Sequence, residues 1–175
     1  AGVAHEVKNP LQVILVGLQY LNDSPLAAEA QSKSVLDEMH DAVKRADIVK
    51  VSDDDLAYLA PGMGVLDAAH QLRAVGGAAV LVTAGASTTS IVTGGSVTEV
   101  PVAPLDSLVV DSIGAGDTFG GALVAWWMAS GRCRPDVDAE GLQQAVLAAH
   151  EAAAVVVTRR GADPPRRAEL PDNWV

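Results

Sequence analysis

The chain has 175 residues, of which 49% are hydrophobic and 3% aromatic, and its formal net charge is −10 at pH 7. This length suffices for one or two domains with a buried core, while the acidic balance and the few aromatic rings argue against nucleic acids and anionic membranes as partners. No apolar run approaches the roughly 18–20 residues of a membrane span, and no signal peptide is visible. The single cysteine, Cys133, excludes an internal disulfide and predicts a reducing, cytoplasmic location.

Residues 1–46 predict two amphipathic helices joined by a short turn. Apolar residues recur at helical spacing, at Val7, Leu11, Ile14, Leu18 and Leu21. Turn formers and a proline at 22–25 end the first helix, and a second helical pattern covers about 30–46. Such a hairpin cannot bury its apolar stripes alone, so we expect a homodimer that forms a four-helix bundle.

His5 lies beside Glu6 at the start of this hairpin. An imidazole can accept a phosphoryl group if a carboxylate takes its proton, although a helical histidine beside a glutamate is most often an ordinary solvated pair. The string AHEVKNPL at 4–11 resembles the H-box of sensor histidine kinases, and the segment resembles their dimerisation domain. The resemblance implies that His5 is the phosphoacceptor, Glu6 its acid–base partner and Asn9 a helper in phosphotransfer. It implies a response-regulator receiver domain as partner. The ATP-binding boxes of that family have no counterpart after residue 47.

After residue 47 the pattern changes to β-branched runs that alternate with helical stretches. The runs predict strands at 47–51, 78–85 and 107–111 and a hairpin of 89–95 and 96–102 with a Gly-Gly turn. Helices are expected at about 65–75, 117–130 and 139–154, followed by a closing strand or extended tail at 155–165. This alternation predicts an α/β layer fold whose sheet has an unpaired edge.

The sequence Gly114-Ala115-Gly116-Asp117 stands between the last predicted strand and the long apolar helix. Glycines allow consecutive backbone amides to point at one spot, and the helix dipole adds positive potential there. That arrangement suits a transferring phosphoryl group, and Asp117 could remove the proton of an attacking hydroxyl. The plainer alternative is that Asp117 caps the helix and the glycines only make a tight turn.

Four strings in order resemble the C-terminal half of the PfkB/ribokinase family of sugar and nucleoside kinases, with fructokinase-like members nearest by eye. They are VKVSDDDL at 49–56, LVTAGAS at 81–87, VVDSIGAGDTFGGAL at 109–123 and AAAVVVTRRGADPP at 152–165. The resemblance covers 47–175 and implies an ATP-dependent carbohydrate kinase with a truncated ribokinase-like α/β fold. Its implied catalytic centre is Asp117 as base, with Gly114, Ala115 and Gly116 as the anion hole.

The same resemblance implies the nucleotide and metal positions. Thr83 and Gly85 would lie along the nucleotide, and His150 stands where many members have an asparagine near the adenine. Asp55 would organise Mg²⁺ through water in place of the usual glutamate, and a monovalent cation is a further implied cofactor. The run Asp53–Asp55 is otherwise typical of a solvated helix start.

The two resemblances meet near 43–48, which predicts two domains, 1–46 and 47–175. Natural fusions usually join whole domains through exposed linkers, so an engineered or recombinant chimera without enzymatic activity is an alternative. The chain opens without a methionine, as a fragment would. The half of the kinase family that supplies the sugar site has no counterpart in 47–175, and we therefore expect little or no sugar kinase turnover.

Overall fold

The computed structural model describes residues 46–105, 107–132, 137–172 and 174. The predicted helical hairpin, its four-helix bundle and the homodimer through it fall outside these residues. The description below therefore concerns the α/β part of the chain.

The centre of the fold is a four-stranded sheet in the order β1-β2-β3-β4. β1 pairs with β2 in parallel, whereas β2 with β3 and β3 with β4 are antiparallel. The strands are β1 Ile48–Ser52, β2 Ala79–Thr83, β3 Thr88–Val92 and β4 Val97–Pro101. The predicted strands at 47–51 and 78–85 and the hairpin are thereby confirmed, and β1 and β4 are the outer strands of the described sheet.

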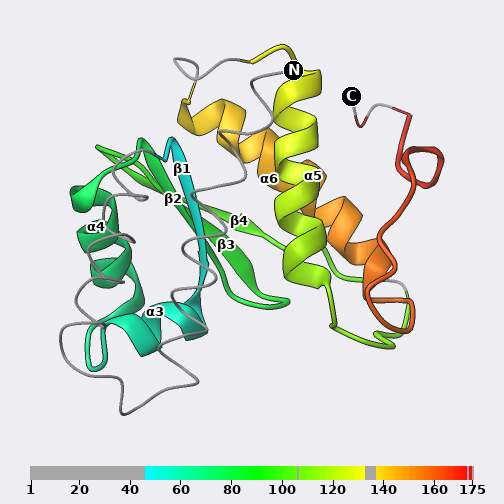
Figure 1. Ribbon diagram of the computed structural model, residues 1–175, viewed down its shortest axis with the longest axis horizontal. Helices are drawn as coiled ribbons and strands as arrows, with labels where there is room; N and C mark the ends of the chain where they lie inside the picture. The colour runs from blue at the N-terminus through cyan, green and yellow to red at the C-terminus, as the bar shows by residue number, and fades with distance from the viewer. Residues whose placement is uncertain (1–45, 106, 133–136, 173, 175) are drawn as a thin grey trace, which may run out of the picture.

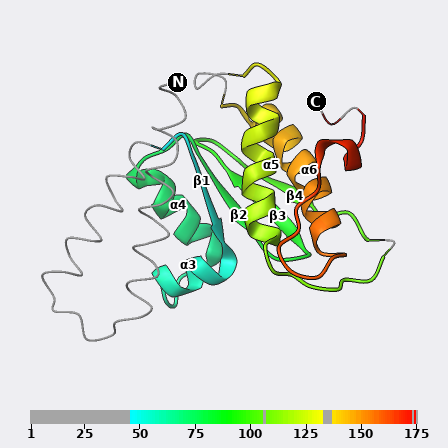
Figure 2. The ribbon, with the colours of Figure 1, turned by 45° about the vertical axis from the view of Figure 1, so that its right-hand side comes forward.

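Four α-helices cover the two faces of the sheet, which gives three layers (Figures 1 and 2). α3 and α4 lie on one face, and α5 and α6 lie on the other. Their bounds are α3 Asp53–Leu59, α4 Val65–Val75, α5 Ala115–Ala129 and α6 Ala139–Val156. The three longer helices were expected from the sequence and are confirmed. A 3-10 turn at Arg167–Glu169 lies in the C-terminal tail.

Alternation along the strands separates two apolar cores. Val49, Val51, Val80 and Val82 pack under α4 with Ala68 and Ala69, whereas Leu81 and Ile91 point to the opposite face and contact α5 and α6. Leu81 and Ile91 are fully buried, and burial of such a side chain is worth about 1.5–3 kcal/mol. Because successive side chains of a strand point to opposite faces, Ile48 and Lys50 of β1 lie on the α5–α6 side.

The segment 107–111 was predicted as a strand, and this prediction is wrong. It is extended but pairs with no strand of the described sheet, and the amides of Val110 and Asp111 instead donate to the carbonyl of Val157 at 2.8 and 3.2 Å. β-branched residues favour an extended backbone, but a strand also needs a neighbouring strand, which the string SLVVD cannot reveal. The stretch 155–165 likewise contains the end of α6 and an irregular tail, and no strand.

Candidate functional site

The N-terminus of α5 is shaped by Gly114. This residue is the N-cap and has φ +79°, ψ 0°, in the left-handed region. A Cβ on Gly114 would lie 2.7 Å from Cβ of Ala162, which is closer than real side chains pack. Glycine is therefore required twice here, once by the backbone conformation and once by the close approach of the C-terminal tail.

Two backbone amides at this helix end have no acceptor among the described residues. The amide of Ala115 donates to the carbonyl of Ser112 at 3.2 Å, and that of Thr118 donates to Gly114 at 2.8 Å. No side chain caps α5. The amides of Gly116 and Asp117 are therefore the two that have no hydrogen-bond acceptor among the described residues. They occupy the second and third helical positions, where a capping oxygen normally binds. Because the helix dipole adds positive potential there, this end of α5 suits an anion.

The structure bears on the alternative in which Asp117 caps the helix. Asp117 does not cap α5, because the N-cap is Gly114 and Asp117 lies in the first turn with an exposed side chain. The amide of Ala115, one of the three residues of the expected anion hole, donates within the turn to the carbonyl of Ser112. The available donors are the amides of Gly116 and Asp117, beside the Asp117 carboxylate.

Asp111 fastens the loop before α5 to the tail after α6, a role that the sequence analysis did not identify. Its Oδ1 accepts from the amide of Ile113 at 3.0 Å, and its Oδ2 accepts from the amide of Gly161 at 2.9 Å. The hydrogen bond from Ile113, followed by that from Gly161, lowers the pKa of Asp111 below its usual 3.8. The only sequence signal was an acidic residue directly after the apolar run 108–110.

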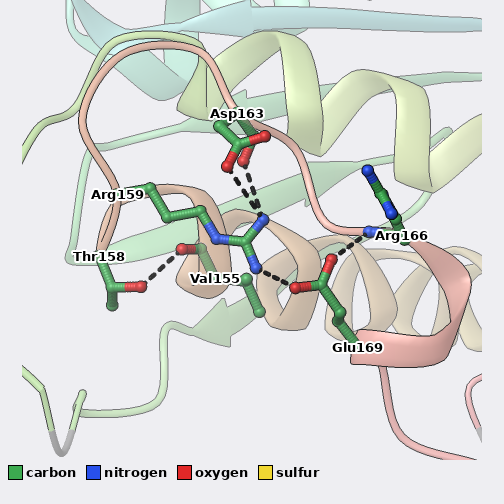
Figure 3. Close-up of polar contacts among 6 residues, drawn as sticks. All are labelled: Val155, Thr158, Arg159, Asp163, Arg166 and Glu169. Carbon is green, nitrogen blue, oxygen red and sulfur yellow. Dashed lines mark hydrogen bonds and ion pairs between the residues drawn. The ribbon is translucent and has the colours of Figure 1, made fainter.

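The tail that reaches Gly114 is itself held by a polar cluster (Figure 3). The guanidinium of Arg159 pairs with the carboxylates of Asp163 and Glu169. The second oxygen of Glu169 accepts from the amide of Arg166 at 2.8 Å. These bonds span residues 159–169 and hold the tail whose Ala162 lies against Gly114.

Lys50 of β1 approaches the same helix end. A Cβ on Gly116 would lie 3.4 Å from its Nζ. The C-terminal end of β1 and the N-terminus of α5 lie at the same end of the sheet in Figure 1. The available sequence signal was a lysine within the otherwise apolar run 48–51, and it was missed.

Asp55 follows directly after β1 and forms a capping box with Ser52. The amide of Asp55 donates to Oγ of Ser52 at 3.0 Å, and Oδ2 of Asp55 accepts from the amide of Ser52 at 3.0 Å. The acidic run is thus a helix start, as the alternative interpretation had it. Only Oδ2 of the half-buried Asp55 takes part in this box. Oδ1 makes no capping bond, so capping does not conflict with the expected role of Asp55 beside a metal ion.

Thr83 and Gly85 lie at the same edge, where β2 ends. Oγ1 of Thr83 donates to the carbonyl of Val51 at 3.4 Å, which ties the ends of β1 and β2 together. Gly85 has φ +54° in the turn that leads to β3. No described contact joins either residue to His150.

His150 lies in the core between α6 and β3. Its Nε2 is 2.9 Å from Oγ1 of Thr89, and its ring centroid is 5.6 Å from that of Phe119. Nδ1 is buried and has no partner among the described residues. Burial lowers the pKa of His150 below the usual 6.5, because desolvation disfavours the charged imidazolium.

His150 also lines a cavity of about 340 Å³ between α6 and the segment that follows β4. The cavity has apolar walls, including Trp126 and Trp174, and a polar contribution from Gln144 and Glu151. Its lining thus combines apolar and polar side chains. The side chains of GAGD do not line it.

The described residues contain neither a metal-ligand cluster nor a membrane-spanning helix. No group of three or more histidine, cysteine, aspartate or glutamate side chains there could hold a metal ion. Within the described ranges, no helix is both long and apolar enough to cross a membrane. His5, Glu6 and Asn9 lie outside the described residues.

Comparisons with known proteins show the family of the chain. Residues 21–169 match the sequence model of the pfkB family carbohydrate kinase. The matched range begins within the segment 1–46, and no comparison supports a histidine kinase segment or a chimera. No curated protein matches the chain.

Solved structures of kinases share the fold. Aminoimidazole riboside kinase from Salmonella enterica, complexed with aminoimidazole riboside and an ATP analog, is 28% identical with a TM-score of 0.65 over 79% of this chain and 44% of its own. A putative ribokinase II from E. coli, in complex with ATP and Mg²⁺, is 27% identical with a TM-score of 0.58 over 74% and 39%. Fructokinase with bound ATP from Xylella fastidiosa is 27% identical with a TM-score of 0.63 over 72% and 41%. The chain thus spans about two fifths of the length of these kinases.

Proposed function

Because the chain belongs to the pfkB family of carbohydrate kinases, we propose that it binds Mg-ATP and supports phosphoryl transfer to a sugar hydroxyl at the N-terminus of α5. The observation that carries this proposal is the pair of amides of Gly116 and Asp117, which have no acceptor among the described residues. They flank an exposed carboxylate that is free of capping bonds. Anion binding and proton removal are the two tasks that phosphoryl transfer requires of a protein.

In the proposed reaction the oxygen of the sugar hydroxyl attacks the γ-phosphorus of ATP. The bond between that phosphorus and the β–γ bridging oxygen breaks, and ADP leaves with the bonding electrons. Asp117 accepts the hydroxyl proton, and the two amides stabilise the charge on the equatorial oxygens. Donors fixed by the Gly114 turn need no reorganisation when that charge develops.

Mg²⁺ fits this site if most of its ligands are phosphate oxygens and water, the usual arrangement for this ion. Asp55, with one oxygen outside the capping box, would hold the ion through water. When bound, Mg²⁺ neutralises the phosphate charge. A monovalent cation remains an expectation from the family resemblance.

The nucleotide would run from the N-terminus of α5 along the edge formed by Thr83 and Gly85. The cavity beside His150 is proposed for the adenine, because its aromatic and apolar walls suit a flat heterocycle. ATP or an ATP analog is named as bound in the three related kinases, which supports a nucleotide as the ligand of this chain. The identity of the sugar is left to a substrate panel.

Calorimetric titration with Mg-ATP tests the proposal. Gly116→Val should abolish saturable binding, because a branched side chain would cover the amides beside Lys50. Gly121→Val is the matched control, since a Cβ at this α5 position meets nothing within 4 Å, and it should bind like the parent chain. Equal affinity of the parent and Gly116→Val would contradict the assigned site.

Asp117→Asn tests the role of the base. Amide replacement keeps the size of the side chain but cannot take a proton, so any transfer to a panel of ribose, fructose and riboside acceptors should fall by about 100-fold or more. Affinity for Mg-ATP should stay within about threefold, since the backbone amides bind the phosphate. Unchanged transfer in Asp117→Asn would show that another group removes the proton.

A further inference from the structure

The C-terminal tail ends against the cavity beside His150. Trp126 and Trp174 both line this cavity, and they come from different parts of the chain. Trp126 belongs to α5, whereas Trp174 lies in the tail, which runs alongside α6 in both ribbon views (Figures 1 and 2). One of the two indole rings at the cavity is therefore in place only when the tail is docked.

Trp174 is fixed by hydrogen bonds and by burial. Its indole Nε1 donates to the carbonyl of Ala148 in α6 at 2.9 Å, and its backbone amide donates to the carbonyl of Pro171 at 3.0 Å. The side chain is 8% exposed and belongs to the core beneath α5 and α6. Because an indole has a single donor, which is used here within the protein, a ligand in the cavity would meet only the apolar surface of this ring.

The tail before Trp174 is held by Arg167. Its Nη1 donates to the carbonyls of Leu170 and Pro171 at 3.5 and 3.1 Å, and its Nη2 donates to the carbonyl of Asp172 at 3.2 Å. One guanidinium thus fixes three consecutive carbonyls of the tail. The position of Trp174 is set by these local contacts as well as by its bond to α6.

His150 supplies a buried polar group beside these rings. Its side chain is only 9% exposed and lines the cavity, and its Nδ1 has no partner among the described residues. A buried polar atom without a partner costs free energy, which a hydrogen bond from a ligand can recover. The cavity therefore suits a ligand with a flat apolar face and with hydrogen-bonding nitrogen atoms at its edge.

We propose that Trp174 is a base-binding residue, which packs against a face of the adenine while the edge of the base pairs with His150. This inference rests on the proposed function, because it adds a residue of the C-terminal tail to the base site of that function. Aromatic side chains bind nucleic-acid bases through such contacts between faces. A tryptophan that only completed the core would stabilise the fold but would not respond to the base.

The test compares Trp174→Leu with Trp127→Leu. Trp127 packs, half-buried, against the same core but does not line the cavity. The probes are adenosine, Mg-ATP and inorganic tripolyphosphate, titrated by calorimetry. Trp174→Leu should weaken adenosine and Mg-ATP by about tenfold or more, and Trp174→Phe, which keeps an aromatic ring, should restore most of that affinity. Affinity for tripolyphosphate should stay within about twofold in every variant, and Trp127→Leu should leave all three affinities unchanged.

The possible outcomes separate this inference from the proposed function. Affinities for adenosine and Mg-ATP that Trp174→Leu leaves unchanged would overturn the role of Trp174 alone. Adenosine binding that depends on Trp174, with Mg-ATP bound no more tightly than adenosine, would overturn the phosphate site of the proposed function and keep the contact with Trp174. An absence of binding of adenosine and of Mg-ATP by the parent chain would overturn both.

A second measurement keeps all three tryptophans of the chain and so does not depend on a core substitution. The tryptophans are replaced by 5-fluorotryptophan, and fluorine NMR follows their resonances, which single Trp→Phe variants assign. Adenosine should shift the resonances of Trp126 and Trp174 and leave that of Trp127 in place. A Trp174 resonance that stays unchanged at saturating adenosine would overturn the proposal.

Discussion

The turn before α5 depends on the absence of a side chain at Gly114. Its left-handed backbone, at φ +79°, costs an ordinary residue about 1–2 kcal/mol, and a Cβ would lie 2.7 Å from that of Ala162. Gly114→Ala should therefore lower the free energy of unfolding by about 2–4 kcal/mol. Urea denaturation measures this change.

Gly121→Ala provides the matched control in the same helix. A Cβ at this position meets nothing within 4 Å, and alanine is favoured over glycine in a helix by roughly 0.5–1 kcal/mol. The variant should therefore be slightly more stable than the parent chain. Equal destabilisation by both alanines would show that the turn at Gly114 tolerates a side chain.

At the scale of elements, the contact between α6 and β3 depends on an uncharged imidazole. Burial lowers the pKa of His150 below 6.5, so the unfolded chain binds this proton more readily than the folded one. The free energy of unfolding should then decrease as the pH falls below about 6.5, and this contribution is fully present above that pH. The dependence should end below the lowered pKa of the folded state.

Substitution of this histidine isolates the effect. His150→Gln should reduce the slope of unfolding free energy against pH between about 5 and 6.5, compared with the parent chain. A slope that His150→Gln does not change would assign the pH dependence to other groups.

The elements that could be predicted from sequence are those whose signals are local. The β-branched run that includes Val49 and Val51 predicts a strand, whichever strand it pairs with. The GAGD string before an apolar run predicts a loop followed by a helix. The fold class and the family were both within reach of such patterns. The hydrogen bond that the Ala115 amide makes within the turn was not, because only the path of the backbone reveals it.

What escaped prediction depends on contacts between distant segments. Lys50 reaches Gly116 across the gap between sheet and helix, and Asp111 bonds to a residue 50 positions later. The segment 107–111 has strand-like composition, yet its amides meet the end of α6 instead of another strand. A single sequence carries no direct record of such pairings.

On the scale of the whole molecule, one apolar edge is open to solvent. It consists of Leu108, Val109, Val110 and Ile113, whose exposed fractions are 88%, 61%, 59% and 62%. Exposed apolar side chains that gather into a patch favour association. We expect the chain to self-associate at high concentration, with light scattering reporting the apparent mass.

The double variant Leu108→Lys and Val109→Lys should raise the concentration of half-association by about tenfold or more, since each buried side chain contributes roughly 1.5–3 kcal/mol. Met128→Lys is the control, because Met128 is 69% exposed at the far end of α5 and outside this edge. Association that the double variant leaves unchanged would place the interface elsewhere.

The bond between Asp111 and Gly161 has a consequence for the order in which the chain assembles. It closes a loop that contains both α5 and α6, so it forms only after those helices have come together. Long-range closures of this kind come at an entropic cost that local helix formation does not share. The proposed phosphate site should therefore be among the last parts of this α/β unit to form during folding, after the chain around Gly161 has joined Asp111.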